Sequence, residues 1–241
     1  MLVDTGTGVG DLPAFVAALT DLPLTVICTH GHVDHAGGAS LFKEVYLAPA
    51  DWELARRPGT AQMQADYAVL MMGEAAKQLT PQDLAPVRTA PFLPLEDGAL
   101  FPLGGVSVQA VALPGHTQGM TCILIPEERS VIMGDACNTR VFLFDSDACP
   151  VSEYRQNLLD FQAAHGGRYD TVYLSHAFDT VPKAVLEDCV ELCGEILAES
   201  DDHIPFSFMG QQKCMAKAAG PDGLRLDGKI GNIVYDPQHL R

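Results

Sequence analysis

Four side chains that can bind a metal ion lie close together near the start of this chain. They are His30, His32, Asp34 and His35. The apolar run 24–28 precedes them and predicts a buried strand, while Gly37-Gly38 follows and leads into a short helix predicted over 39–44. The cluster is therefore expected on a loop at the carboxyl end of a strand, where α/β folds place their chemistry.

The spacing within this cluster suits metal binding. His30 and His32 are two residues apart, so in an extended segment both imidazoles point to the same side. Gly31 between them adds no side chain that would crowd an ion. Asp34 and His35 follow where the chain must turn, so they can face a second point nearby. Neutral imidazole is a common zinc ligand, and a carboxylate is a good partner for it.

The length and the composition limit the class of protein. The 241 residues suffice for one large domain or two small ones, and a hydrophobic share of 47% is enough for a sizeable core. No run of apolar residues is long enough to span a membrane, and the first residues lack the basic flank and apolar core of a signal peptide. The seven cysteines are scattered without a Cys-x-x-Cys pair, which indicates reduced, mostly buried thiols in a cytoplasmic protein.

The net charge of the chain limits the partners that it can be expected to bind. The formal net charge is −16, which disfavours binding to nucleic acid or to an anionic membrane, because both select basic surfaces. It also disfavours a highly anionic substrate unless a local Arg or Lys offsets the field. The expected partner is therefore a small-molecule substrate.

Apolar strands that alternate with helices predict an α/β fold in one domain over 1–241. Helices are expected over 12–19, 50–56, 61–79, 152–165 and 182–198. Two of these helices form a helical insertion at about 49–86, broken at Pro58-Gly59, and its stripe of Met63, Tyr67, Leu70 and Met71 is expected to pack in the core. From about residue 200 a polar tail follows, with one strand expected over 230–235, and the sequence leaves its placement open.

Further motifs resemble a known family. The segment His30-x-His32-x-Asp34-His35 resembles the signature of metallo-β-lactamase-fold hydrolases. Three later segments resemble the family's other motifs, each after an apolar run: 114–119 with His116, Gly134-Asp135, and Ser175-His176. Asp4-Thr5-Gly6 resembles the family's opening strand and turn, in which Asp4 would hold a ligand histidine or the motif loop in place.

The resemblance implies a four-layer αββα sandwich with two metal ions. By resemblance, His30, His32 and His116 hold one ion, Asp34, His35 and His176 hold the second, and Asp135 bridges both. In the family a β-hairpin usually precedes the first strand, and this sequence apparently lacks those strands. Such a loss would expose a sheet edge and invite pairing into a homodimer.

The implied chemistry is hydrolysis. Ligands rich in nitrogen and without thiolate suit two Zn²⁺ ions, with Fe or Mn as alternatives. A hydroxide that bridges two zinc ions would attack a small ester, thioester, lactone or phosphodiester, with Asp34 as a catalytic residue. Cys137, two residues past Asp135, is expected to pack rather than to bind metal. Tyr154, Arg140 and Lys213 are candidates for substrate contacts.

Two alternatives from other classes stay open. The first is an iron-dependent oxygenase or redox protein on the same fold, although the resembling diiron proteins carry a carboxylate where His32 stands here. The second is a non-catalytic metal-binding module, which the absence of the usual opening strands would favour. The bridging position held by Asp135 resembles the glyoxalase II and lactonase branch more than the β-lactamases that place a Cys there.

Overall fold

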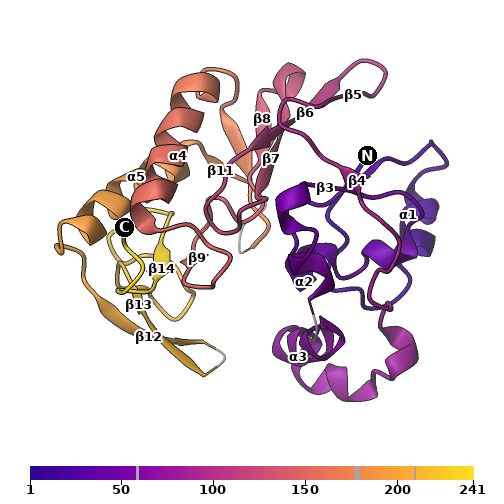
Figure 1. Ribbon diagram of the computed structural model, residues 1–241, viewed down its shortest axis with the longest axis horizontal. Helices are drawn as coiled ribbons and strands as arrows, with labels where there is room; N and C mark the ends of the chain where they lie inside the picture. Colours follow the sequence, from indigo (N-terminus) through magenta and orange to yellow (C-terminus); the bar gives the residue numbers. More distant parts are fainter. Residues whose placement is uncertain (58–59, 177–179, 209) are drawn as a thin grey trace. The chain divides into compact units, whose positions relative to one another are not determined.

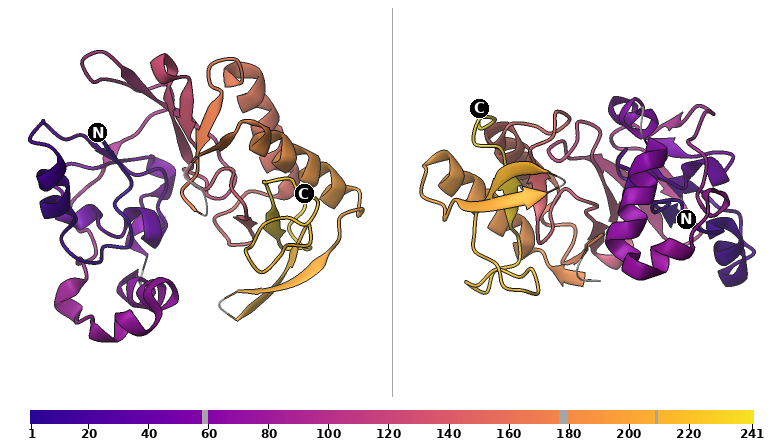
Figure 2. Two further views of the ribbon diagram at one scale, coloured as in Figure 1. Left: turned by 180° about the vertical axis from the view of Figure 1, so that it is seen from behind. Right: turned by 90° about the horizontal axis from the view of Figure 1, so that it is seen from below.

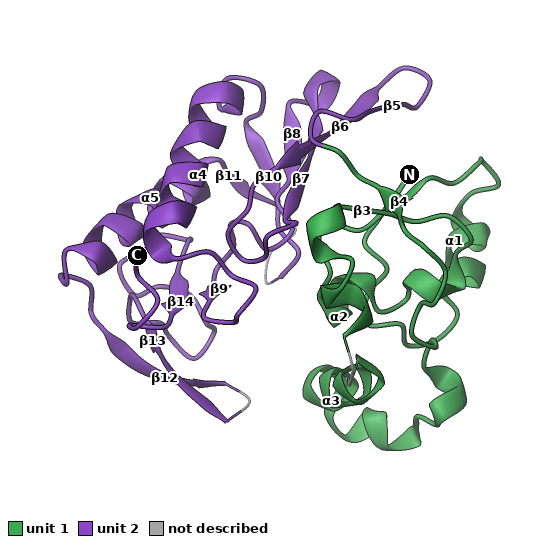
Figure 3. Cartoon of the chain, in the orientation of Figure 1, with its two compact units in different colours: residues 1–96 green, residues 97–241 purple. Residues whose placement is uncertain are grey.

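The chain folds into two compact units, residues 1–96 and residues 97–241 (Figure 3). The computed structural model describes residues 1–57, 60–176, 180–208 and 210–241. The break expected at Pro58-Gly59 lies outside the described residues. The single-domain organisation stays a prediction.

Unit 1 contains a parallel sheet in the order β1-β2-β3-β4 (Figures 1 and 2). Its strands and α-helices are β1 (Leu2–Val3), α1 (Leu12–Leu19), β2 (Val26–Ile27), α2 (Val33–Ala36), β3 (Tyr46–Leu47), α3 (Thr60–Met72) and β4 (Leu93–Pro94). Helix α1 has the predicted bounds, because Asp11 caps it by accepting a hydrogen bond from the Ala14 amide and Pro13 fits its first turn. The short helix expected over 39–44 is a single 3₁₀ turn, η1 (Ala39–Leu41).

The segment 49–86 is helical, as predicted, but it is built mostly from 3₁₀ turns. The helix predicted over 50–56 is two turns, η2 (Pro49–Asp51) and η3 (Leu54–Arg56). Helix α3 ends at Met72 because Gly73 adopts a φ of +54°, which leaves the α-helical region. The turns η4 (Gly73–Gln78) and η5 (Pro81–Asp83) follow.

The apolar stripe of α3 is not in the core, so that expectation was wrong. Leu70 and Met71 are 58% and 71% exposed. The buried positions of α3 are Thr60, Gln64 and Ala68. The Gln64 Nε2 donates hydrogen bonds to the carbonyls of Gly37 (3.0 Å) and Ala85 (3.1 Å), so these contacts turn a polar face of the helix inward.

A buried arginine joins the second half of unit 1 to the first. Arg88 is 5% exposed, and its guanidinium donates four hydrogen bonds to backbone carbonyls. These carbonyls belong to Ala39 (2.7 Å), Phe42 (2.7 Å), Lys43 (2.9 Å) and Pro91 (3.0 Å). A lysine could not replace this planar fork, because its three donors sit on one atom.

Unit 2 holds two sheets and two long helices. One sheet has the order β11-β10-β8-β7-β6-β5 and the other the order β12-β13-β14-β9. The elements are β5 (Leu100–Pro102), β6 (Ser107–Ala112), β7 (Thr121–Ile125), η6 (Pro126–Glu128), β8 (Ser130–Ile132), β9 (Val141–Leu143), α4 (Val151–His165), β10 (Thr171–Tyr173), β11 (Thr180–Pro182), α5 (Ala184–Leu197), β12 (Ile204–Phe208), β13 (Gln211–Met215) and β14 (Ile233–Tyr235). One hydrophobic core joins residues of both sheets to α4 and α5, which lie side by side (Figures 1 and 2).

Both long helices of unit 2 were predicted, with one error. Pro182 was expected in the first turn of the last helix, but it ends β11, where it pairs with Thr171. The helix α5 begins two residues later. Cys189 and Cys193 lie on its buried face, as expected from their spacing of four residues.

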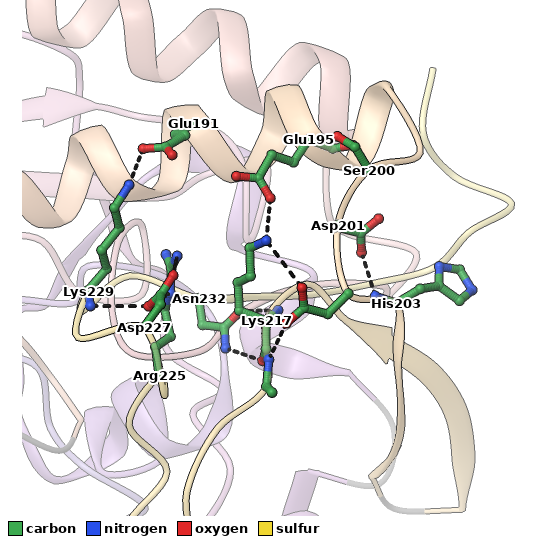
Figure 4. A network of polar contacts seen from close by, with 12 residues as sticks. Glu191, Glu195, Ser200, Asp201, His203, Lys217, Arg225, Asp227, Lys229 and Asn232 are labelled. Carbon is green, nitrogen blue, oxygen red and sulfur yellow. Dashed lines mark hydrogen bonds and ion pairs between the residues drawn. The ribbon is translucent and has the colours of Figure 1, made fainter.

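The tail from residue 200 packs on unit 2. It contributes β12, β13 and β14, and the predicted strand is confirmed as Ile233–Tyr235. Figure 4 shows charged contacts that hold this tail to α5 and to itself. Lys217 pairs with Glu195 (2.6 Å) and Asp202 (3.3 Å), and Lys229 pairs with Glu191. These pairs connect α5 to two separate stretches of the tail.

The cysteines have the environment that the composition predicts. All seven cysteines are buried and none is joined in a disulfide. Cys137 packs in the core of unit 2, as predicted.

Among the described residues, none of the helices combines the length and the apolar character needed to cross a bilayer.

The substitution Arg88→Leu should lower the free energy of unfolding by about 3 kcal/mol, because it leaves four backbone carbonyls without their donor. Urea unfolding followed by circular dichroism measures this loss. The control Lys77→Leu removes an exposed cation that pairs only with exposed Glu74, so it should change the value by less than about 0.5 kcal/mol. Equal losses in the two variants would contradict the role given to Arg88.

Candidate metal centre

The first motif lies where its flanking strand ends, as predicted. The strand β2 stops at Ile27, and His30 and His32 follow on the loop before α2. Helix α2 then carries Asp34 and His35. The imidazole rings of His30 and His32 are 5.0 Å apart between centroids, and those of His30 and His35 are 4.0 Å apart. The four predicted ligand-type residues of unit 1 are therefore gathered in one place.

Asp4 holds this motif from the end of β1. Its Oδ2 accepts a hydrogen bond from the His35 Nδ1 at 2.8 Å. Its Oδ1 accepts a hydrogen bond from the Thr29 amide at 2.7 Å, and the Thr29 hydroxyl lies 3.0 Å from both carboxylate oxygens. Asp4 has a φ of +63°, a left-handed conformation that aspartate tolerates better than most residues. The position expected for Asp4 is confirmed, and it holds both the histidine and the loop.

These hydrogen bonds fix which nitrogen of each ring carries the proton. A carboxylate only accepts, so the His35 Nδ1 must donate to Asp4 and its Nε2 keeps a lone pair. The Thr29 hydroxyl donates its single proton to Asp4, so it accepts from the His30 Nδ1 at 3.1 Å. The His30 Nε2 therefore also carries a lone pair. This tautomer, with Nδ1 bonded to a neighbour, is the one that metal-binding histidines usually adopt.

The buried carboxylate of Asp51 shapes the loop from the other side. Asp51 is 1% exposed, and its Oδ2 accepts a hydrogen bond from the Gly31 amide at 2.9 Å. A Cβ at Gly31 would lie 2.7 Å from the Asp51 carbonyl oxygen. Glycine is thus required at position 31 because the backbone of Asp51 approaches closely. The sequence had suggested a different reason, that a side chain there would crowd an ion. Sequence analysis missed Asp51, because nothing local marks an acid that acts on a residue twenty positions earlier.

Unit 2 gathers the other three predicted residues. The His116 Nδ1 donates to the carbonyl of Phe142 at 2.8 Å, which leaves a lone pair on its Nε2. That Nε2 lies 3.6 Å from the Asp135 Oδ2, and the His176 Nε2 lies 3.3 Å from the Asp135 Oδ1. The two oxygens of Asp135 thus face different histidines. The side chains of His116 and Asp135 are mostly buried, and that of His176 is 41% exposed.

The loop that carries His116 is set by a tyrosine. Tyr154 is fully buried, and its hydroxyl donates to the carbonyl of Ala136. Its ring lies so close to Gly115 that a Cβ there would be 2.3 Å from a ring carbon. Tyr154 therefore supports the loop and cannot contact a substrate as suggested. The ammonium group of Lys213 pairs with the Asp236 carboxylate at 2.7 Å. Substrate contacts by Lys213 and by Arg140 stay predictions.

The thiols offer no ready nucleophile. Burial raises the pKa of the Cys28 and Cys122 thiols far above the usual value. Burial and the nearby Glu153 raise the pKa of Cys149 to about 12. These three thiols therefore stay protonated at neutral pH.

The sequence was compared with known proteins. A family model described as "Metallo-beta-lactamase superfamily" matches residues 1–176. The human protein "Acyl-coenzyme A thioesterase MBLAC2" is 29% identical over 153 residues, which cover 56% of this chain and 53% of that protein. The "Atrochrysone carboxyl ACP thioesterase" of Aspergillus fumigatus is 25% identical over 139 residues, which cover 56% of this chain and 26% of that protein. The alignments thus span about half, or less, of the length of these curated relatives.

Solved structures share the fold. The "Metallo-beta-lactamase from Pontibacter korlensis" superposes with a TM-score of 0.54 at 16% identity, covering 80% of this chain and 81% of that one. At this identity the likeness concerns the fold alone.

The substitution Asp4→Ala should weaken zinc binding about 10- to 100-fold, because it releases the Nδ1 anchor of His35 and the Thr29 amide. Competition with a chromophoric chelator measures the affinity. The control Asp11→Ala removes an acid whose side chain caps α1 and which lies outside the motifs, so it should leave zinc affinity unchanged. Unchanged affinity in folded Asp4→Ala protein would show that Asp4 does not support a metal site.

Proposed function

Because the chain belongs to the metallo-beta-lactamase superfamily, we propose that it is a metal-dependent hydrolase of acyl thioesters. The observation that carries this proposal is the set of anchored imidazoles, in which the Nδ1 atoms of His30, His35 and His116 are each bonded to a protein partner. This anchoring is the one that metal-binding histidines usually show. The thioester class is supported by the names of the relatives, one an acyl-coenzyme A thioesterase and the other an acyl carrier protein thioesterase.

The proposed metal ligands are the seven residues that the family resemblance implies. His30, His32 and His116 would hold one ion, and Asp34, His35 and His176 would hold a second. Asp135 would bridge them, a role supported by its two oxygens, which face different histidines within unit 2. The donors are imidazole nitrogens and carboxylate oxygens without a thiolate. This set fits divalent ions of the zinc, iron and manganese group, and zinc is the first choice.

When bound, the two ions polarise the thioester carbonyl and lower the pKa of a water molecule to about 7. The chain's own residues orient the side chains that would hold the ions. Asp4 and Thr29 keep the rings of His30 and His35 in one tautomer, and Asp51 fixes the backbone between His30 and His32. Asp34 accepts the proton of the attacking water. The water oxygen bonds to the carbonyl carbon, and the carbon–sulfur bond breaks to release a carboxylic acid and a thiolate. The proton held by Asp34 then passes to the thiolate, so that the products are a carboxylic acid and a thiol.

A thioester suits this constellation because a thiol, with a pKa near about 8.5, leaves as a thiolate without prior protonation. No separate general acid is then needed beside Asp34. All seven cysteines are buried, and burial raises the pKa of Cys28 and Cys122 far above the usual value, which supports water rather than a thiol as the nucleophile of the proposed reaction.

The net charge of −16 affects which thiol group can carry the acyl chain of the substrate. A protein with this charge repels polyanions such as coenzyme A at low ionic strength, and salt screens the repulsion. A neutral or weakly charged carrier experiences no such barrier. The proposed substrate is therefore an acyl thioester whose carrier is small or little charged.

Exhaustive chelation should abolish hydrolysis of an S-acyl-N-acetylcysteamine thioester, and two equivalents of Zn²⁺ should restore it, because water activation depends on the ions. Metal analysis by mass spectrometry, on protein purified without added metal, should give two zinc ions per chain. Asp135→Asn should lower both metal content and turnover, whereas Asp145→Asn, a nearby acid outside the motifs, should change neither. Hydrolysis that survives metal removal would refute the proposal, and iron near one per chain with oxygen-dependent turnover would replace it with an oxygenase.

The ratio kcat/KM for an acyl-coenzyme A thioester should rise several-fold between about 0.01 M and 0.15 M NaCl, because screening shortens the reach of the protein's negative field. The same acyl group on uncharged N-acetylcysteamine should show little change. Steady-state kinetics at several salt concentrations measures both. A salt-independent rate for the coenzyme A substrate would show that local cations govern its binding.

A further inference from the structure

A hollow with uncharged walls lies in unit 1, between α3 and the turns that follow it. Its volume is about 520 Å³, within the range of small-molecule sites. The lining residues are Ala61, Gln62, Gln64, Ala65, Ala68, Val69, Ala76, Leu79, Thr80, Pro81, Leu84, Ala85 and Pro86. None of them is charged, although the chain as a whole carries 31 acidic residues. The wall therefore suits an uncharged, mainly apolar molecule.

The size of the hollow follows from the small side chains of α3. Ala61, Ala65 and Ala68 face it on successive turns of the helix. The opposite wall is formed by η4, η5 and the residues just after them, which curl back beside α3 (Figure 1). Thr60 and Met63 lie on a different side of α3, where they line a crevice with His32. The hollow is thus separate from the crevice beside the metal motif.

One polar group in this wall is incompletely bonded. Gln64 is 1% exposed, and its Nε2 is committed to the carbonyls of Gly37 and Ala85. Those two acceptors fix the orientation of the amide, since both require the NH₂ group. Among the residues that the structure describes, no donor reaches the Gln64 Oε1. A buried acceptor without a donor costs free energy, which a ligand can recover by supplying one.

We propose that this hollow binds a small molecule with an alkyl or acyl chain and one hydrogen-bond donor, a hydroxyl or an amide N–H, directed at the Gln64 Oε1. The chain lies along the alanine face of α3. Because Oε1 is closed off from water in this conformation, the ligand parts the wall beside Gln64 to reach it, and the unmet acceptor lowers the cost of that movement. The proposal is independent of the hydrolase function.

The test uses two isomeric probes, octan-1-ol and 1-methoxyheptane, which have the same atoms but only one of which has a donor. Isothermal titration calorimetry on the full chain should show one octan-1-ol per chain, bound at least fivefold more tightly than the ether. A substitution of Gln64 is unsuitable because it would also release Gly37, next to the metal motif.

Two matched variants locate the binding. Ala65→Leu places three more carbons against the alanine face, where it partly fills the hollow, and should weaken octan-1-ol binding at least tenfold. Ala75→Leu adds the same side chain at an exposed position outside the lining and should leave the binding unchanged. If circular dichroism shows that Ala65→Leu does not fold, Ala61→Leu at an exposed lining position takes its place. Equal affinity for the two probes, retained binding in the filled variant, or no binding to the folded chain would each overturn the proposal. Because calorimetry needs no turnover, these outcomes do not depend on whether the chain hydrolyses thioesters.

Discussion

The hydrogen bonds of the Asp4 carboxylate are the interactions on which the histidine motif of unit 1 depends. It joins the end of β1 to Thr29 and His35, which lie on either side of the motif loop. Through the Thr29 hydroxyl it also sets the proton position on His30. One side chain thereby controls the orientation and the chemical form of two imidazoles. Asp51 adds the remaining constraint by fixing the peptide between His30 and His32.

The ligand-type residues of unit 2 are held by the backbone rather than by a carboxylate. The carbonyl of Phe142, in β9, fixes the tautomer of His116, and the ring of Tyr154 in α4 excludes a side chain at Gly115. The three strands of the tail form one four-stranded sheet with β9, in which β14 pairs with β9, so the C-terminal segment supports the strand that anchors His116. The tail thus contributes to the centre through the fold of unit 2.

The sequence predicted the features that depend on neighbours along the chain. The mixed α/β class and the sandwich fold of the superfamily are confirmed. The helix Leu12–Leu19 follows from Asp11 and Pro13, and the cluster of His30, His32, Asp34 and His35 follows from its spacing. His116, Asp135 and His176 were added by the family resemblance, and the ligand role of all seven stays a prediction. Features that depend on distant partners were missed. The inward face of α3 is polar because Gln64 bonds to Gly37 and Ala85, and Arg88 is buried because four carbonyls from other segments surround it.

The left-handed backbone of Asp4 narrows the choice of residue at that position beyond its chemistry. Glutamate carries the same charge, but its longer chain does not share the tolerance of aspartate for a φ of +63°. Asparagine suits the backbone, yet its amide group would face the His35 Nδ1 as a donor once its oxygen accepts from the Thr29 amide. The proton of His35 would then move to Nε2. The residue at position 4 therefore determines the tautomer of His35. Exchanging one carboxylate oxygen for an NH₂ group would move the ring proton from Nδ1 to Nε2.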